Sequence, residues 1–348
     1  MNITNETSST SEAVHDDCHL SEEEIEHAYN LTLHIVSVFV LLVASFLGAS
    51  LSVASARVKA FHISPIVLNL GKFFGSGVVL ATGFIHILPD AMETLSDSCL
   101  PDSWNEYSAY GGLFAMIAVL LMQLIEFLAH EKSEPIHHVH YHHHHHDGDE
   151  NHGHVDIIQM EPPITSLEQC AESNHHHHGL AFQNDNQQNK ISTYLLEFGI
   201  ALHSVLIGLT LGTTTESFVA LFIALCFHQF FEAIALGAQI ANLKSTSTKS
   251  AIFMVIFFSL TTPLGIAIGI GIHSGVYNPK SVSYLLSTGI LDSFSAGILI
   301  YVALVNLITA EMGANAHAFN NSSRRLKFVY FVALYLGAAA MAVIGRWA

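Results

Sequence analysis

The sequence is poor in charged residues and in cysteine. Only 12% of its 348 residues are charged, which is about half of what a soluble protein carries. The 12 basic residues are scattered and the formal net charge is −17, so the chain lacks the basic patch that a nucleic-acid partner requires. The four cysteines form no C-x-x-C pair, which argues against thiolate zinc knuckles and thioredoxin chemistry.

Several functional motifs are also missing. No G-x-x-x-x-G-K-[ST] loop is present, so ATP is not expected to drive the protein directly. No H-E-x-x-H protease motif occurs, and we expect neither an enzyme nor a bound cofactor. The first 29 residues are acidic and polar and have no apolar core of a signal peptide, so the first long apolar helix is expected to act as the insertion signal.

What the chain has instead is long apolar segments. It is 51% hydrophobic with a mean hydropathy of +0.43. Because lipid leaves only helices or closed barrels, we predict an all-α integral membrane protein, a bundle of eight transmembrane helices. The predicted spans are 31–56, 66–89, 109–130, 191–213, 217–241, 250–273, 283–310 and 326–347.

Lysine and arginine predict the orientation of the spans. If both termini are extracellular, nine basic residues fall in inner loops, namely Arg57, Lys59, Lys132, Lys190, Lys244, Lys249, Arg324, Arg325 and Lys327. Lys280 and Arg346 fall outside, and Lys72 lies within the second span, where it snorkels or pairs with an acid. The opposite topology would invert this bias. Cys18 and Cys99 both fall on the outer side, where a disulfide can persist.

The chain therefore divides into four regions. An acidic extracellular tail covers 1–30, helices one to three cover 31–130, and helices four to eight cover 191–348. Between them, 131–190 is polar and holds 14 of the 25 histidines, which predicts a disordered cytosolic loop. It contains two histidine runs, His142, His143, His144, His145, His146 and His175, His176, His177, His178. We expect these runs to bind zinc weakly and to release it below about pH 6.5, where the imidazoles protonate. A plain flexible spacer is the alternative for this loop.

Two runs in the fourth and fifth spans carry the strongest signal. His203 lies 10 residues before Thr213 and His228 lies 11 after Ser217, so a short outer turn would set both roughly 15 Å deep, near the bilayer midplane. Glu232 follows His228 by one helical turn and shares its face. Imidazole and carboxylate suit zinc and its first-row neighbours. We predict a metal site of His203, His228 and Glu232, to which Ser204 and Gln229 could add oxygen ligands.

Other polar residues predict a metal path along the bundle. His86 and Asp90 are one turn apart at the outer end of the second span and could form a mouth, or simply cap an interfacial helix end. Glu126 and His130, one turn apart in the third span, and Glu197 in the fourth could mark the inner exit, or be interfacial polar residues. Asp292 and Asn306 in the seventh span are interpreted as structural hydrogen-bonding residues.

These motifs resemble those of one family of membrane proteins. The run Glu197–Gly208 resembles the fourth-helix signature of the Zrt/Irt-like (ZIP) metal transporters, in their fungal and plant branch, and Phe227–Glu232 resembles the fifth. Ala81–Asp90 and Ser259–Gly265 resemble the second and sixth helices, and eight spans with a histidine-rich loop after the third also agree.

The resemblance implies uptake of zinc, sometimes iron or manganese, into the cytosol through the fourth and fifth helices. It also implies motion of one helix group against the other. Ile207 and Gln229 stand where bacterial relatives have carboxylates, so one ion per cycle is expected here. Position 233 is alanine where glycine is usual, and Asn306 stands where close relatives often have an acid.

The sequence is thus interpreted as a multi-pass plasma-membrane zinc importer whose partners are the lipid bilayer and divalent metal ions; a homodimer is left open. An importer that prefers iron or manganese is the first alternative. A zinc exporter is disfavoured because exporters of the cation-diffusion type have six spans. A histidine-box metalloenzyme is disfavoured because the run His137–His146 lies in a predicted loop and not on helices. A metal receptor without transport is the remaining alternative.

Overall fold

The computed structural model describes residues 29–57, 63–133, 178–215, 217–243, 247–273, 280–313 and 317–347. Within these ranges, eight helical spans are long and apolar enough to cross a membrane: Leu31–Ser55, Pro65–Thr94, Tyr110–Ala129, Lys190–Thr213, Phe218–Asn242, Thr248–His273, Val282–Met312 and Arg324–Ile344. They match the predicted segments one for one. The prediction of an all-α membrane protein with eight spans is confirmed.

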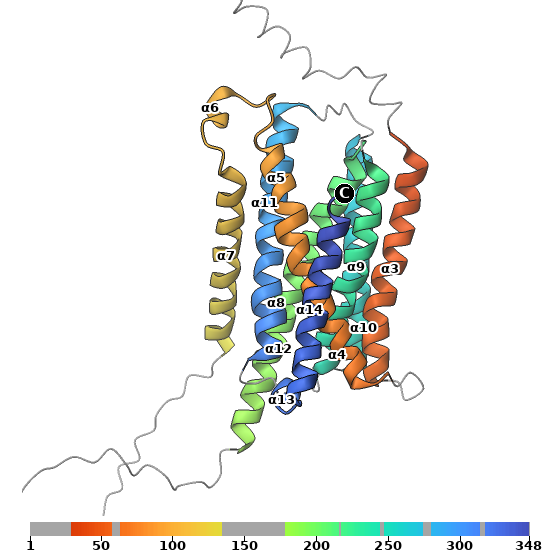
Figure 1. Ribbon diagram of the computed structural model, residues 1–348, viewed down its shortest axis with the longest axis vertical. Helices are drawn as coiled ribbons and strands as arrows, with labels where there is room; N and C mark the ends of the chain where they lie inside the picture. The colour runs from red at the N-terminus through yellow and green to blue at the C-terminus, as the bar shows by residue number, and fades with distance from the viewer. Residues whose placement is uncertain are drawn as a thin grey trace, which may run out of the picture.

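The spans run roughly side by side in one bundle (Figure 1). They are α3 (Leu31–Arg57), α4 (Pro65–Ala81) with η2 (Thr82–Ile87) and α5 (Leu88–Thr94), α7 (Tyr110–Ser133), α8 (His178–Thr213), α9 (Phe218–Asn242), α10 (Thr248–His273), α11 (Val282–Tyr301) with η3 (Val302–Thr309) and α12 (Ala310–Met312), and α14 (Arg324–Ile344). Short helices α6 (Asp102–Asn105) and α13 (His317–Asn320) lie in the connections. We call the end of the bundle at which α3 begins the upper end.

Local sequence explains several helix starts. Ser281 accepts a hydrogen bond from the backbone N–H of Tyr284 at the start of α11, and Ser323 does the same for Leu326 at the start of α14. Pro65 opens α4, where its missing N–H costs nothing. Once begun, an apolar helix persists because all its backbone groups are bonded internally.

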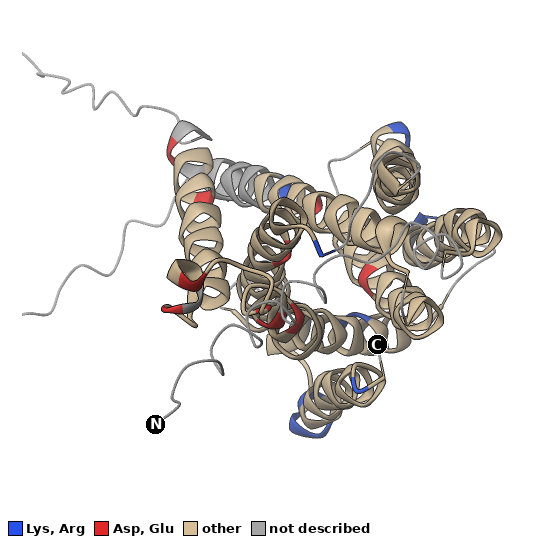
Figure 2. Cartoon of the chain, turned by 90° about the horizontal axis from the view of Figure 1, so that it is seen from above, with Lys and Arg blue, Asp and Glu red and all other residues tan. Residues whose placement is uncertain are grey.

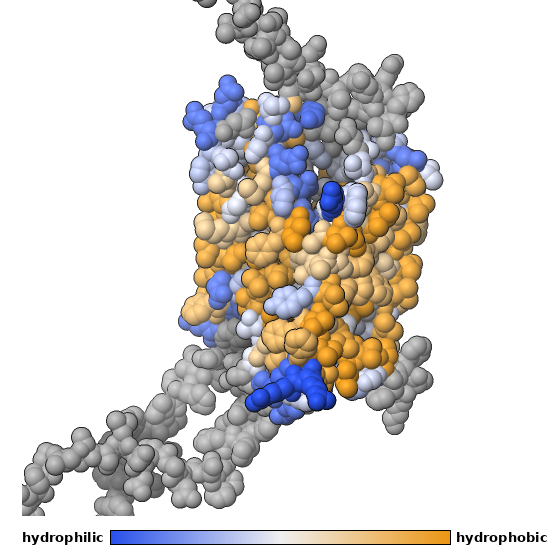
Figure 3. Space-filling model, viewed as in Figure 1, coloured by the Kyte–Doolittle hydropathy of each residue, from blue (hydrophilic) through white to orange (hydrophobic). Residues whose placement is uncertain are grey.

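The surface of the bundle is that of a membrane protein. A broad hydrophobic band covers the visible face between two hydrophilic ends (Figure 3). Large apolar side chains such as Phe39, Leu120 and Tyr335 are 59–69% exposed on α3, α7 and α14, where lipid would cover them. Seen from above, most of the helix surface is uncharged, and the acidic and basic residues lie at scattered positions (Figure 2).

Two spans contain π-helical turns that the sequence analysis did not predict. In the second span η2 directly precedes the turn with Pro89, which has no N–H to continue the α-helical ladder. In the seventh span, the hydroxyl of Thr309 donates to the carbonyl of Leu304, five residues back, at 2.7 Å. A π turn rotates the side chains that follow it, and such turns are frequent at functional sites.

Close helix packing joins α8 to α10. Gly208 and Gly212 of α8 face α10, and a Cβ at either position would lie 2.5 Å from a backbone carbonyl oxygen of α10, at Thr262 or Ile266. Only glycine allows this approach. At the upper end, the ring of Tyr29 stacks on both His34 and His273, and its hydroxyl donates to the carbonyl of Gly212 at 2.9 Å. The start of α3 is thereby tied to α8 and α10.

The structure differs from the expected loop 131–190 at its end. Helix α8 begins at His178, 12 residues before Lys190, where the structure places the start of the span. The polar residues before Lys190 extend a helix whose membrane part is already formed, and adding a turn to an existing helix needs no new nucleus. The histidine runs up to His177 lie outside the described residues. Cys99 is disulfide-bonded; Cys18, its predicted partner, also lies outside them.

Candidate metal centre

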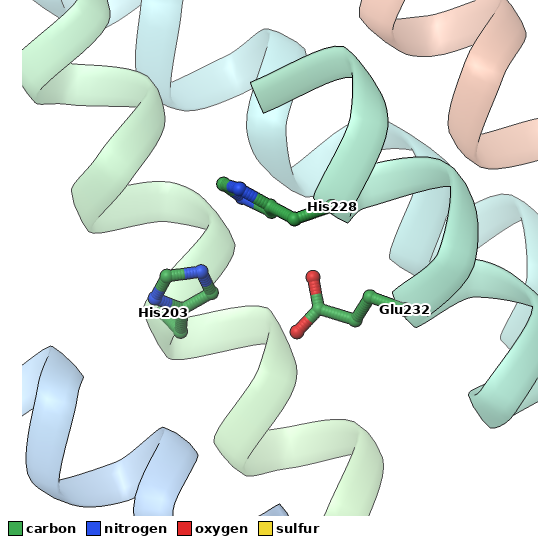
Figure 4. Close-up of side chains that lie close together, drawn as sticks. All are labelled: His203, His228 and Glu232. Atoms are coloured by element: carbon green, nitrogen blue, oxygen red, sulfur yellow. The ribbon is translucent and has the colours of Figure 1, made fainter. Parts of the chain in front are cut away.

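Helices α8 and α9 bring His203, His228 and Glu232 together (Figure 4). One ligand atom from each residue lies within 4.8 Å of the other two. The two imidazole rings are 5.9 Å apart between centroids, so the histidines are level, as the helical rise predicted. Glu232 projects from α9 one turn after His228, and its carboxylate points toward both rings (Figure 4).

All five residues of the predicted site are buried in the interior. Their side chains are at most 1% exposed. Within the described residues, most of their polar atoms have no hydrogen-bond partner, namely His203 Nε2, Ser204 Oγ, both ring nitrogens of His228, both amide atoms of Gln229 and both carboxylate oxygens of Glu232. A buried polar atom without a partner costs about 1–3 kcal/mol, so this cluster needs an occupant. The donor set fits a first-row divalent cation.

His86 lies closer to this centre than the sequence analysis expected. We placed it at an outer mouth, but its ring centroid is 6.3 Å from that of His228. His86 belongs to η2, and the π turn directs its ring into the bundle, where the residue is 8% exposed. Asp90, one turn further on in α5, is exposed toward the upper end. Of the two residues, only His86 lies close to the centre.

Asp292 in α11 and Asn306 in η3 each make a side-chain hydrogen bond. Asp292 is 2% exposed and accepts a hydrogen bond from the hydroxyl of Thr210 in α8 at 3.3 Å. Asn306 donates to the Glu126 carboxylate at 3.2 Å. Both contacts agree with the interpretation of Asp292 and Asn306 as hydrogen-bonding residues.

The three predicted exit residues lie below the centre and do not form one cluster. Glu126 in α7 is half-buried and accepts hydrogen bonds from Tyr301 and Asn306, at 2.7 and 3.2 Å. Glu197 in α8 is 6% exposed, and among the residues that the structure describes one of its carboxylate oxygens, Oε1, has no hydrogen-bond partner. His130 belongs to the last turns of α7, and its side chain lies outside the described part of the structure.

Sequence reasoning missed one residue that touches the site. Ser295 in α11 lies with its Oγ 2.6 Å from Nδ1 of His203, and it is 1% exposed. The signal was present, because Asp292, Ser293 and Ser295 form a polar run inside an otherwise apolar span. Lys72 was expected to snorkel or to pair with an acid. It pairs with Glu311 of α12.

A bundle of membrane-spanning helices that directs two imidazoles and a carboxylate into its buried interior is typical of membrane proteins that handle divalent metal ions. A family model described as ZIP Zinc transporter matches residues 31–345. The chain therefore belongs to the ZIP zinc transporter family, and it is a membrane transporter of divalent metal ions, not an enzyme.

Relatives agree with this family over nearly the whole chain. Fe(2+) transport protein 1 of Arabidopsis thaliana is 34% identical over 334 residues, which cover 93% of this chain and 88% of that protein. Probable zinc transporter 8 of the same plant is 35% identical over 329 residues, with coverage of 93% and 88%. Zinc transporter 9 of Oryza sativa subsp. japonica is 33% identical over 351 residues, with coverage of 95% and 93%.

Proposed function

We propose that this transporter imports zinc across the plasma membrane into the cytosol, and that His203, His228 and Glu232 bind the ion midway. The observation that carries the proposal is the convergence of three ligand side chains from two adjacent helices. Within the described residues, His203 Nε2, both ring nitrogens of His228 and both carboxylate oxygens of Glu232 have no hydrogen-bond partner. Ser204 and Gln229 act as adjustable oxygen ligands beside them.

The proposed ligand set suits transport better than storage. Glu232 supplies the one negative charge, and two neutral imidazoles supply nitrogen ligands, so positions around the ion stay open for exchange. A transport site must bind well enough to select and weakly enough to release. A closed site of four thiolates would hold zinc too tightly for this purpose.

The proposed direction rests on charge. If both termini are extracellular, most basic residues lie in the inner loops. By the positive-inside rule, these loops are cytosolic. Metal would then enter past Asp90 and His86 at the upper end and leave past Glu197, Glu126 and His130. The histidine-rich loop between α7 and α8 would receive it in the cytosol.

Iron is a second candidate cargo. One of the similar proteins is named as an Fe(2+) transport protein, and others are named as zinc transporters. Imidazole and carboxylate ligands suit both ions, so the ligand set does not separate them.

The test is uptake of zinc, iron and manganese, each measured separately, in cells that lack their own importers. Cells that express the full chain should take up zinc in preference to the other two, and surface biotinylation should label the protein at the plasma membrane. Preferred uptake of iron would replace zinc as the cargo. Zinc efflux in place of uptake would overturn the proposed direction.

Light scattering on the detergent-purified chain tests whether the protein forms a homodimer.

A further inference from the structure

Ser295 makes the one hydrogen bond found for the side chains of the five site residues in the described structure. Its Oγ lies 2.6 Å from Nδ1 of His203, and the other polar atoms of the five residues have no hydrogen-bond partner. Ser295 belongs to α11, whereas the proposed ligands belong to α8 and α9. The hydroxyl therefore reaches the centre from a third helix.

We propose that Ser295 is a positioning residue that fixes the ring orientation of His203 for metal binding, with Nδ1 toward the hydroxyl and Nε2 toward the other ligands. This inference rests on the proposed function, because it takes His203 to be a ligand. With Nδ1 facing the Ser295 hydroxyl, Nε2 is the nitrogen left for the metal, and it has no partner in the structure.

The chemistry of the imidazole explains why one hydroxyl matters. A neutral imidazole carries one N–H, and the nitrogen that binds a metal must be the other one. When Nδ1–H donates to the Ser295 Oγ, the lone pair is at Nε2, toward His228 and Glu232. Partners of this kind on the second nitrogen typically change metal affinity by about 10–100-fold.

The packing around Ser295 supports a fixed geometry. Two turns further up α8, Thr210 donates to Asp292, which lies one turn before Ser295 on α11. The His203–Ser295 and Thr210–Asp292 contacts thus both join α8 to α11, on the same side of each helix. Without the hydroxyl at 295, the ring of His203 would still be buried but free to turn its N–H toward the centre.

The first test compares Ser295→Ala with the wild type in proteoliposomes that hold the full chain, with zinc flux measured over a range of zinc concentrations. The expected result is a half-saturating concentration raised about 10-fold or more, with maximal flux per protein changed by less than about twofold. A merely structural role would lower the amount of folded protein and the maximal flux, and would leave the half-saturating concentration unchanged.

A matched pair separates the hydroxyl from packing. Ser295→Thr keeps the hydroxyl, and Ser295→Val has nearly the same shape without it, so Thr should restore the wild-type half-saturating concentration and Val should not. Ser293→Ala is the control on the same helix, because the buried Ser293 hydroxyl donates to the carbonyl of Gly289 in its own helix, at 2.6 Å, and not to a proposed ligand. It should behave as wild type.

The outcomes distinguish this inference from the proposed function. If His203→Ala keeps wild-type flux, the proposed metal site is wrong, and the proposed role of Ser295 is wrong as well. If His203→Ala is inactive but Ser295→Ala has wild-type constants, only the role of Ser295 is overturned. Equal behaviour of Ser295→Thr and Ser295→Val, or a shifted half-saturating concentration in Ser293→Ala, also overturns it.

Discussion

Lys72 and Glu311 form an ion pair near the lower end of the bundle. The side chain of Lys72 is 1% exposed and that of Glu311 is 20% exposed. Gln239 donates to the same carboxylate oxygen at 3.2 Å, so α4, α9 and α12 meet at one charged point. A buried pair of this kind is costly to break from one side, because it leaves a charge without compensation.

Removing one partner of this pair should destabilise the protein more than removing both. We expect Lys72→Met or Glu311→Leu to cost about 3–5 kcal/mol and to lower the melting temperature of the purified protein. The double variant should recover much of that loss. The measurement is thermal unfolding in detergent for all four proteins. Additive losses in the double variant would show that the two charges do not depend on each other.

Removing any ligand of the proposed centre should stop transport. His203→Ala, His228→Ala and Glu232→Ala are each expected to lower zinc uptake to near background at normal surface abundance. The reason is that each supplies one of the three convergent ligand atoms. The measurement is zinc uptake normalised to the amount of protein labelled by surface biotinylation. Wild-type uptake rates in two of the three variants would show that the site assignment is wrong.

The neighbours of these ligands should matter less. Ser204→Ala and Gln229→Ala each remove a weaker oxygen ligand, so we expect uptake to fall partly and the half-saturating zinc concentration to rise. Complete loss of uptake in either variant at normal abundance would move that residue into the essential set.

The level placement of His203 and His228 follows from helical rise and a short connection, and could be predicted from sequence alone. The position of His86 could not, because it depends on a π turn, which simple i, i+4 spacing ignores. Ser295 and the Lys72–Glu311 pair depend on how distant helices are rotated against each other. Lys72 and Glu311 are 239 residues apart, and local sequence carries no information on such a contact.

The glycine contact between α8 and α10 should be needed to hold His203 in place. A Cβ at Gly208 would meet the carbonyl oxygen of Thr262 at 2.5 Å, so Gly208→Ala should push the helices apart, cost about 1–3 kcal/mol and lower zinc uptake. Gly112→Ala is the matched control, because a Cβ there would meet no atom of the described residues within 4 Å. If both variants have the same stability and uptake, the contact is not limiting.

The histidine-rich loop should be dispensable for transport itself. Deleting residues 136–177 leaves every described transmembrane helix intact, so we expect uptake at low zinc to stay within about twofold of wild type. The response to excess zinc should change, since clustered imidazoles bind the metal weakly and reversibly. A deletion variant that reaches the surface but carries no metal would place the loop in the transport path.

The centre should hold one metal ion at a time. Two divalent ions about 4 Å apart repel with about 16 kcal/mol at an effective dielectric constant of 20, four times the value for unit charges. Glu232 offers one negative charge. Ile207, one helical turn after His203, and Gln229, next to His228, are both buried and carry no charge. Nothing among these side chains would offset the repulsion.

The measurement is the metal content of the centre, from anomalous X-ray scattering of zinc-loaded crystals. This method distinguishes ions in the centre from ions bound to the histidine loop. One zinc within coordination distance of His203, His228 and Glu232 is expected, and Gln229→Asp should permit a second. Two fully occupied ions bridged by Glu232 in the wild type would show that the charge argument is wrong.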